Sequence, residues 1–173
     1  GTVEKRKNYP RLVEAFALAA HENSDLQLVI AGSAGDDSDL LQQAVDSLSP
    51  KMAERVHLIG RVTDDNIGWL YQQAAAMAYP SLDEGFGFPL LEAMSANLPI
   101  VGSTLGSIPE VSGTAAILVD PFDVSALAEA LTNVVTNSEL RIKLQSAGAT
   151  QFQSFSWEKT AQQLVNLYNE LVN

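Results

Sequence analysis

Cysteine is absent from this 173-residue sequence, and basic residues and long apolar runs are scarce. Without cysteine the chain has no disulfides and no thiolate chemistry, which fits a protein of the cytosol. No apolar run approaches the length that spans a membrane, and the first residues lack the pattern of a secretory signal peptide. Because the sequence starts at Gly1-Thr2 without a methionine, we expect it to be a piece of a longer chain.

The shortage of positive charge restricts the partners of the protein. The chain has 10 Lys and Arg residues against 21 Asp and Glu residues, which gives a formal net charge of −11. Nucleic acids and anionic membranes bind to basic surfaces, so neither partner is expected. A phosphate group would have to be bound locally, by helix N-termini and a few basic side chains. The one triple-basic run is Lys5-Arg6-Lys7.

Short apolar runs alternate with amphipathic segments along the whole chain. Buried strands are predicted at residues 26–31, 56–59, 74–79, 99–102 and 115–119, and helices in the segments between and after them. Continuous apolar strands between helices are typical of a parallel sheet that is covered on both faces. With 46% hydrophobic residues, the chain can form a sizeable core. We therefore predict an α/β three-layer sandwich formed by a single domain over residues 1–173.

The most informative part of the sequence is the stretch YPSLDEGFGFPLLE at residues 79–92. A short apolar run leads into it, Gly85 and Gly87 allow a tight loop, and the proline that follows suits the start of a helix. A strand, a glycine loop and a helix N-terminus together form a site for an anion. The carboxylates of Glu84 and Glu92 frame this site. A nucleotide sugar offers both the phosphates and the hydroxyls that such groups bind.

The same residues also have plainer interpretations. From spacing alone, Glu92 as a partner of its helix dipole and Glu84 as a solvated loop acid are as well supported as a binding site. Arg6 and Lys7 are by themselves more typical of solvated charges before a helix. Gly32-Ser-Ala-Gly35 follows a strand, but it lacks the third glycine and the spacing of a dinucleotide motif, so NAD binding is not expected.

Five segments occur in an order that matches one family. They are residues 1–8 (GTVEKRKN), 56–62 (VHLIGRV), 79–94 (YPSLDEGFGFPLLEAM), 109–111 (PEV) and 155–157 (FSW). With these segments the sequence resembles the C-terminal half of a GT-B retaining glycosyltransferase of the group 1 (GT4) family, and Glu84 and Glu92 match its E-x7-E motif. The resemblance covers almost the whole chain. It implies a Rossmann-like three-layer α/β/α sandwich that binds a nucleoside-diphosphate sugar.

The resemblance implies a role for each matching residue. Arg6 and Lys7 match the basic pair that contacts the donor diphosphate. Glu84 matches the acid that binds the hydroxyls of the donor sugar, and Glu92 matches the acid that binds the ribose. Arg6, Lys7 and Glu84 are therefore the candidate catalytic residues.

The resemblance also implies a set of donor-binding residues. Backbone at Arg61 and Val62 would hold the base with Ile67 as an apolar wall. The N–H groups of residues 85–88 would hold the sugar and diphosphate, and the turn at 105–107 would border the phosphates. The candidate set is Gly1, Arg61, Val62, Ile67, Gly85, Phe86, Gly87, Phe88, Glu92 and Gly106.

Elementary chemistry supports the roles of the basic pair. Cleavage of the bond between the anomeric carbon and the phosphate leaves additional negative charge on the nucleoside diphosphate. The side chains of Arg6 and Lys7 and a helix N-terminus can stabilise that charge. We therefore expect that the reaction requires no metal ion and no cofactor.

Three features depart from the family pattern. Thr2 stands where some members carry a further phosphate-contacting arginine. Asn97 replaces a common glycine at a helix C-terminus, where asparagine tolerates the left-handed conformation. The N-terminal half, which in the family binds the acceptor and closes over the donor, is absent from this chain. The chain alone is therefore expected to bind the donor but not to catalyse transfer.

The last predicted helix begins near Ser156 and has Trp157, Leu164, Tyr168 and Leu171 on one face. At this helical spacing, Trp157 and Tyr168 are expected to be packing residues. The family resemblance adds an alternative, in which the helix crosses to the other domain and its apolar face is exposed in the present chain.

The expected function is donor binding in a retaining hexosyltransferase that transfers a sugar from a nucleoside-diphosphate sugar to a glycan or glycolipid acceptor. GDP-mannose is the first candidate donor, and UDP-glucose or a related UDP-sugar is the second. A GT-B sugar-nucleotide epimerase and a non-catalytic module that binds a nucleotide or a protein are the alternatives. We expect a cytoplasmic location, or peripheral membrane attachment through the missing domain.

Overall fold

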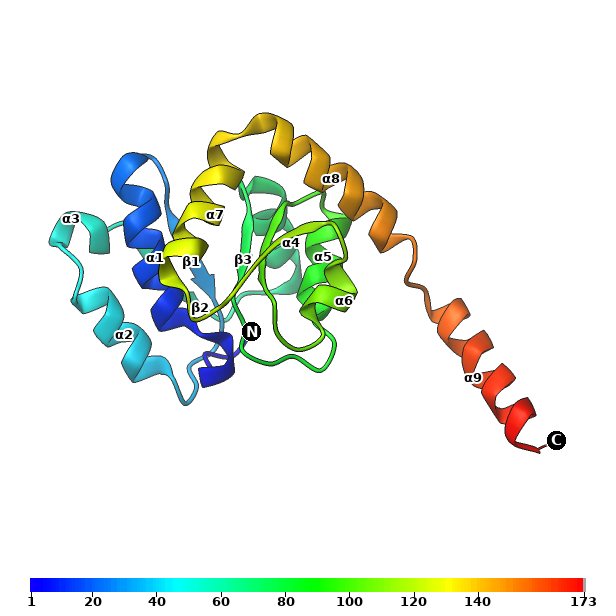
Figure 1. The fold of residues 1–173 in the computed structure, drawn as a ribbon. Helices are drawn as coiled ribbons and strands as arrows, with labels where there is room; N and C mark the ends of the chain where they lie inside the picture. Colours follow the sequence, from blue (N-terminus) through cyan, green and yellow to red (C-terminus); the bar gives the residue numbers. More distant parts are fainter. Residues whose placement is uncertain (173) are drawn as a thin grey trace.

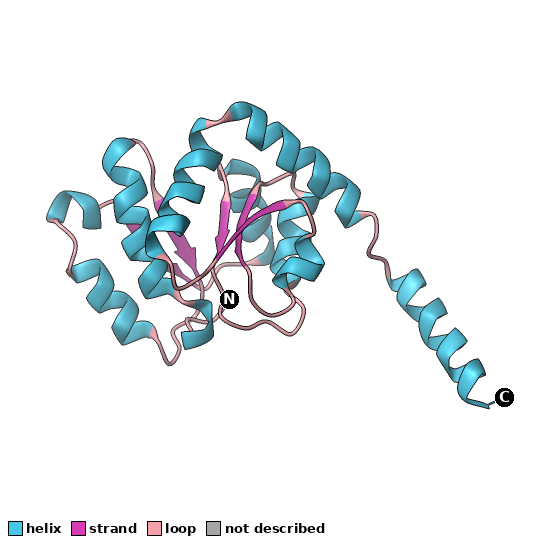
Figure 2. Cartoon of the chain, viewed as in Figure 1, coloured by secondary structure: helices cyan, strands magenta, loops and turns pink. Residues whose placement is uncertain are grey.

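The structure of the protein is a computed structural model that describes residues 1–172. Over these residues helices alternate with strands (Figure 1, Figure 2). The strands are β1 (Leu28–Ala31), β2 (Val56–Gly60), β3 (Met77–Tyr79), β4 (Ile100–Ser103) and β5 (Ala116–Val119). The helices are α1 (Tyr9–Glu22), α2 (Ser38–Asp46), α3 (Pro50–Ala53), α4 (Asp64–Gln73), α5 (Phe88–Ser95), α6 (Ile108–Ser112), α7 (Val124–Thr136), α8 (Ser138–Phe152) and α9 (Trp157–Val172), with a 3-10 helix η1 (Lys5–Lys7) before α1.

The ends of several helices have local causes in the sequence. The Thr63 side chain accepts a hydrogen bond from the Asn66 N–H at the start of α4, and Asp123 accepts one from the Ala126 N–H at the start of α7. Asn97 follows α5 with a φ of 54°, which is the left-handed conformation expected for it.

All strand pairs are parallel, which confirms the predicted α/β class. β1 pairs with β2, β3 pairs with β4, and β4 pairs with β5. The strands form two hydrogen-bonded groups, one of two strands and one of three, rather than a single continuous sheet. Within residues 1–172, β1 and β3 do not pair with each other, and no strand pairs with both.

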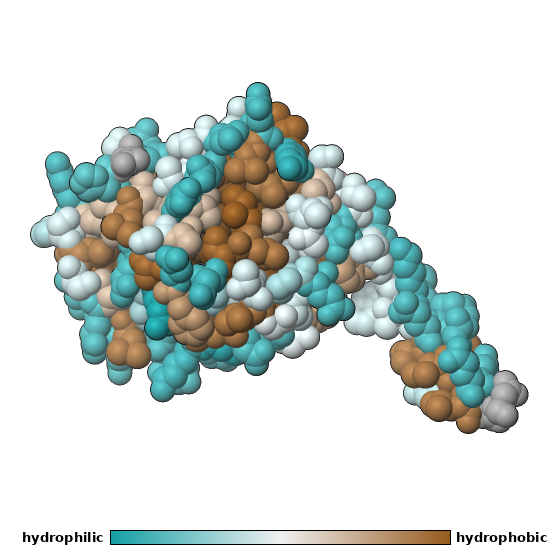
Figure 3. Space-filling model, in the orientation of Figure 1, coloured by the Kyte–Doolittle hydropathy of each residue, from teal (hydrophilic) through white to brown (hydrophobic). Residues whose placement is uncertain are grey.

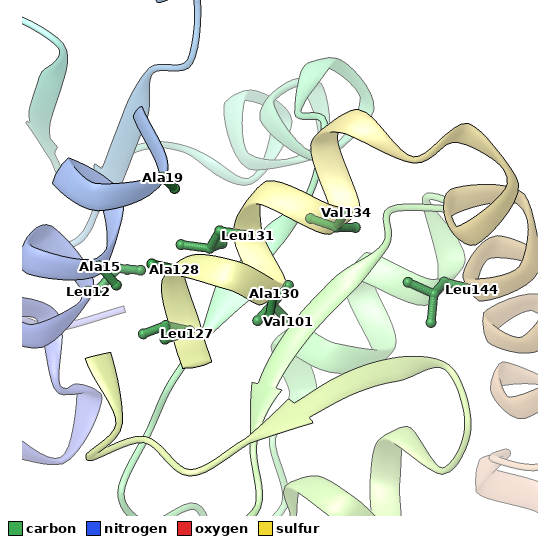
Figure 4. Close-up of a cluster of buried hydrophobic side chains, with 10 residues drawn as sticks. All are labelled: Leu12, Ala15, Ala19, Val101, Leu127, Ala128, Ala130, Leu131, Val134 and Leu144. Carbon is green, nitrogen blue, oxygen red and sulfur yellow. The ribbon is translucent and has the colours of Figure 1, made fainter. Parts of the chain in front are cut away.

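Helices cover both faces of the three-stranded group. Val101 and Ile117 pack with α1 and α7 in one hydrophobic cluster, whose buried members are drawn in Figure 4. The neighbouring residues Ile100 and Leu118 pack with α5 and α6 in a second cluster. Because successive strand residues point to opposite faces, these two clusters lie on opposite sides of the strands. This is the three-layer α/β/α arrangement that the sequence predicts.

The first eight residues run between the ends of the two strand groups. At the carboxyl end of β1, the Gly1 amine donates to the Ala31 carbonyl at 3.0 Å, and the Val3 N–H donates to the Ser33 carbonyl at 2.9 Å. On the other side, the Leu82 N–H, which follows β3, donates to the carbonyl of Arg6 at 2.6 Å. This segment therefore joins the loops that follow β1 and β3.

Close packing against this segment explains two glycines that the sequence did not assign. A Cβ atom on Gly32 would overlap the backbone carbonyl of Gly1, and a Cβ atom on Gly35 would overlap that of Val3. The loop after β1 therefore contains glycine because backbone lies directly against backbone there.

Helix α9 extends away from the rest of the chain (Figure 1), and hydrophobic residues lie on its surface (Figure 3). Trp157 is 76% exposed and Tyr168 is 64% exposed. The prediction that these two residues pack is therefore wrong for the described chain, because α9 leaves the body immediately after Phe155. The alternative, an exposed apolar face, is the one observed.

None of the described helices is both long enough and apolar enough to cross a membrane.

We expect opposite stability changes when alanine replaces two glycines. Gly32→Ala should lower the free energy of unfolding by about 1–3 kcal/mol, because the new Cβ overlaps backbone that cannot move without breaking the Gly1–Val3 contacts. Gly68→Ala is the matched control. Its Cβ would meet no atom within 4 Å, and alanine in α4 should stabilise the protein by up to about 1 kcal/mol. Urea unfolding measures both, and equal effects would contradict the packing of the first residues against the loop after β1.

Candidate functional site

Three charged side chains meet where the N-terminal segment lies against the loop after β3. The Lys7 Nζ is 2.6 Å from Glu84 Oε1, and the Arg6 Nη1 is 2.7 Å from Glu84 Oε2. Lys7 also donates to the Tyr79 hydroxyl at 3.1 Å. Arg6 makes a second ion pair, from Nε to Glu4 Oε2 at 2.7 Å. The fold thus brings the three candidate catalytic residues into direct contact, although 77 positions separate Lys7 from Glu84.

The three side chains differ in their access to solvent. The side chains of Lys7 and Glu84 are only 9% and 8% exposed, whereas that of Arg6 is 43% exposed. Burial by itself would raise the pKa of the Glu84 carboxyl, but hydrogen bonds from Lys7 and Tyr79 hold that pKa below its ordinary value. Glu84 is therefore a carboxylate at neutral pH. Burial and the negative charge of Glu84 raise the pKa of Tyr79, so this residue stays a protonated donor.

Ser81 is a further buried residue near Glu84. Its hydroxyl is buried and has no well-aligned hydrogen-bond partner among the described residues, yet it lies close enough to Glu84 to contribute to lowering the pKa of that carboxyl.

The loop after Glu84 presents backbone donors. Within the part of the chain that the structure describes, the N–H groups of Gly85, Phe86, Gly87 and Phe88 donate no hydrogen bond. Gly87 has a φ of 94° and directly precedes α5, so glycine is required at this position. Gly85 has no positive φ, and a Cβ there would meet open space. Of the two predicted loop glycines, only Gly87 therefore depends on glycine for its conformation.

The turn before α6 supports this loop from one side. The Ser107 hydroxyl donates to the carbonyls of Glu84 and Phe86, at 2.9 Å each. Gly106 has a φ of 61°, and a Cβ on it would lie 3.0 Å from the Glu84 backbone nitrogen. Gly106 is therefore directly adjacent to the glycine loop. Ser107, which belongs to the turn predicted to border the phosphates, holds the loop in place through these hydrogen bonds.

Four of the predicted donor-binding residues line a single pocket at the carboxyl ends of β1 and β2. Its volume is about 340 Å³. The predicted residues Gly1, Arg61, Val62 and Ile67 share it with Thr2, Ala31, Gly32 and Ser33. Arg61 is exposed, and Val62 and Ile67 are half-buried. The loop after β1 was missed as a contributor, although its position after a parallel strand puts it at the same edge of the sheet.

Glu92 lies on α5, just beyond the first turn of the helix. It is the fifth residue of the helix, because α5 begins at Phe88. Its side chain Oε2 accepts a hydrogen bond of 2.9 Å from the hydroxyl of Tyr71 on α4. Burial, and then the negative charge of Glu92, raise the pKa of Tyr71, so its hydroxyl remains a donor. Glu92 is therefore held by another side chain and is not only a partner of its helix dipole.

Two further residues near the site had no predicted role. Phe155 packs edge-on against Phe86, with ring centroids 5.8 Å apart, and Phe86 lies 4.9 Å from Phe88. The start of the final segment therefore contacts the glycine loop. Tyr71 is four residues after Ile67 on α4, and this spacing was the signal that could have placed it on the same helix face.

Among the side chains that the structure describes, no group of three or more His, Cys, Asp or Glu residues could hold a metal ion.

The site combines unpaired N–H groups at a helix start, two cations and two carboxylates at the carboxyl ends of parallel strands. In an α/β domain these features are suited to an anionic ligand such as a phosphate group. The family model for glycosyl transferases group 1 matches residues 1–151, and the chain belongs to this family.

Individual relatives agree with this assignment. The chain is 36% identical to O-antigen chain mannosyltransferase B of Escherichia coli over 172 residues, which is 99% of this chain and 45% of that protein. It is 31% identical to D-inositol 3-phosphate glycosyltransferase of Corynebacterium jeikeium (strain K411), over 99% of this chain and 42% of that protein. It thus spans less than half the length of either relative.

One similar solved structure is matched over most of its own length and most of this chain. The C-terminal domain of a glycosyl transferase group 1 family protein (LpcC) from Francisella tularensis has a TM-score of 0.79 and 25% identity. The match includes 89% of this chain and 82% of that domain. The chain therefore corresponds to the C-terminal domain of a GT-B protein.

The acid sensitivity of the protein should depend on Glu84. Because its pKa is lowered on folding, the unfolded chain takes up the proton at a higher pH than the folded chain. The contribution of Glu84 is therefore complete above the ordinary pKa of 4.5 and is lost as the pH falls through the lower folded-state value.

Glu84→Gln, which cannot titrate, should lose less stability than the unchanged protein between about pH 6 and about pH 3. Urea unfolding across this range gives the slope for each protein. Glu158→Gln, at an exposed position on α9, should keep the original slope. The same slope for all three proteins would show that the Glu84 pairs are not formed in solution.

Proposed function

We propose that the chain is the donor-binding half of a retaining glycosyltransferase that uses a nucleoside-diphosphate sugar. The observation that carries this proposal is the contact of Arg6 and Lys7 with Glu84, directly beside the unpaired N–H groups of residues 85–88. Cations and oriented amides are the groups that stabilise a diphosphate leaving group. A neighbouring carboxylate is suited to accept hydrogen bonds from sugar hydroxyls.

The two cations have different parts in this proposal. Lys7 is buried and held by both Glu84 and Tyr79, so it provides a charge in a fixed position. Arg6 is more exposed, and it is shared between the half-exposed Glu4 and the buried Glu84. Its guanidinium can turn from Glu84 to the diphosphate, and a bidentate contact with phosphate oxygens would replace the ion pair.

This exchange would also free Glu84 for the sugar. In the present structure, Lys7 contacts Oε1 and Arg6 contacts Oε2. When Arg6 turns to the diphosphate, Oε2 becomes able to accept hydrogen bonds from the donor sugar. Lys7 keeps the carboxylate in position and ionised. The diphosphate and the sugar of one donor therefore provide new partners for the Arg6 guanidinium and the Glu84 carboxylate. This limits the free-energy cost of breaking their ion pair.

The pocket at Gly1, Arg61, Val62 and Ile67 is the proposed site of the nucleobase. Its volume of about 340 Å³ is within the usual range for small-molecule sites. The E. coli relative is named a mannosyltransferase, and this favours GDP-mannose as the donor over a UDP-hexose. Family membership also favours transfer over epimerisation.

The remaining parts of the reaction are assigned to the rest of the protein. We propose that a second half binds a glycan or glycolipid acceptor and closes over the donor, so that this chain alone has no transferase activity. We also propose that Arg6, Lys7 and the loop donors stabilise the leaving group without a metal ion or cofactor, and that the protein acts in the cytoplasm.

The direct test is a titration with GDP, UDP, ADP and their sugar conjugates, followed by calorimetry. Binding of one base family, with the diphosphate tighter than the monophosphate, is the expected result. Absence of binding to every nucleotide at millimolar concentration would reject the proposal.

Two substitutions should distinguish the contacts with the diphosphate from the contacts with the donor sugar. Arg6→Ala should weaken the binding of GDP and GDP-mannose equally, by about tenfold to 100-fold, because a charge-assisted contact to the diphosphate is lost. Glu84→Gln should weaken GDP-mannose more than GDP, because it impairs the contact with the sugar.

Lys5→Ala is the matched control, since Lys5 is the exposed neighbour of Arg6 in the same basic run. It should bind both ligands like the unchanged protein. If Arg6→Ala and Glu84→Gln both left the affinity for GDP-mannose unchanged, the assigned site would be wrong.

A further inference from the structure

One face of α4 connects the proposed base pocket with Glu92. Ile67 lines the pocket, and Tyr71, four residues later, donates its hydroxyl to Glu92 Oε2 at 2.9 Å. Residues four apart lie one above the other on the same face of a helix. The side of α4 that borders the pocket therefore continues directly to the carboxylate on α5.

The Tyr71 ring is already anchored without its hydroxyl. It is half-buried and packs against the hydrophobic cluster that includes Tyr79, Leu90 and Ile108. Glu92, in contrast, is exposed. A hydrogen bond to an exposed carboxylate adds little to stability, because water competes for the same oxygen. Stability alone therefore does not account well for this contact.

The contact does determine how the Glu92 carboxylate is presented. Oε2 is occupied by Tyr71, whereas Oε1 has no hydrogen-bond partner among the described residues. A carboxylate that is held at one oxygen loses rotational freedom before a ligand binds. This lowers the entropy cost of using the other oxygen as an acceptor.

We propose that Tyr71 is a positioning residue for nucleoside recognition, which fixes the Glu92 carboxylate so that its free oxygen accepts hydrogen bonds from the ribose hydroxyls. This inference rests on the proposed function, because it assumes that a nucleotide occupies the pocket beside Ile67. It assigns to α4 both the apolar wall for the base and the support for the ribose acceptor.

The substitution Tyr71→Phe tests the role, because it keeps the packed ring and removes only the hydroxyl. Binding is measured by calorimetry with GDP and UDP, with their 2′,3′-dideoxy analogues, and with inorganic pyrophosphate. We expect the tighter-binding ribonucleotide to lose about tenfold in affinity. The dideoxy analogue and pyrophosphate should bind both proteins equally, since neither offers ribose hydroxyls to Glu92.

Two controls show whether the effect passes through Glu92. In a Glu92→Ala background, Tyr71→Phe should cause no further loss, because coupled residues are not additive. Tyr168→Phe makes the same chemical change at an exposed position on α9 and should leave all affinities unchanged.

Three outcomes would overturn the inference. Equal weakening of all probes by Tyr71→Phe would mean that the hydroxyl only maintains the packing of α4. Unchanged ribonucleotide affinity would mean that Glu92 needs no support. If the unchanged protein binds dideoxy and ribose forms equally, Glu92 does not contact the ribose. These results leave the proposed function intact as long as a nucleotide binds, whereas no binding of any nucleotide by the unchanged protein rejects both.

Discussion

The buried ion pair between Lys7 and Glu84 holds the candidate site together. It joins the N-terminal segment to the loop after β3, across a boundary where the two groups of strands share no hydrogen bonds. Both side chains lose most of their water, and an isolated charge in this position would be strongly destabilising. The Tyr79 hydroxyl and the Arg6 guanidinium provide the additional partners that make the pair tolerable. The position of the glycine loop therefore depends on the segment that begins the chain.

The same cluster explains how an acidic protein can contain an anion site. The formal net charge of −11 works against binding a diphosphate at a distance. Within the site, however, the charge is set by Arg6, Lys7 and the free N–H groups of the loop. Glu84 balances the cations when no ligand is bound, so no unpaired buried charge remains. For the binding of an anion, the net charge of the protein thus matters less than the few groups within hydrogen-bond distance of the ligand.

Much of the fold was predictable because its signals are local. Apolar runs, glycines and helix-starting prolines act over a few residues, and they located the strands to within a few positions and placed helices between them. The glycine loop before α5 was found in the same way. The division of the strands into two groups was not, since hydrogen bonds between strands far apart in the chain depend on the tertiary packing. The exposure of α9 could not be predicted from local signals either, because an amphipathic pattern predicts an apolar face but not what packs against it.

The amino-acid sequence by itself determined the order of the elements, the parallel arrangement of the strands and the residue types that gather at their carboxyl ends. It also identified Arg6, Lys7, Glu84 and Glu92 as the candidate ionic groups. Only the tertiary structure decided which of these groups touch: both cations meet Glu84, and Tyr71 holds Glu92. The reason is physical. Hydrogen bonds and ion pairs require contacts near 3 Å, and such distances between residues far apart in the chain are set by the packing of helices on strands.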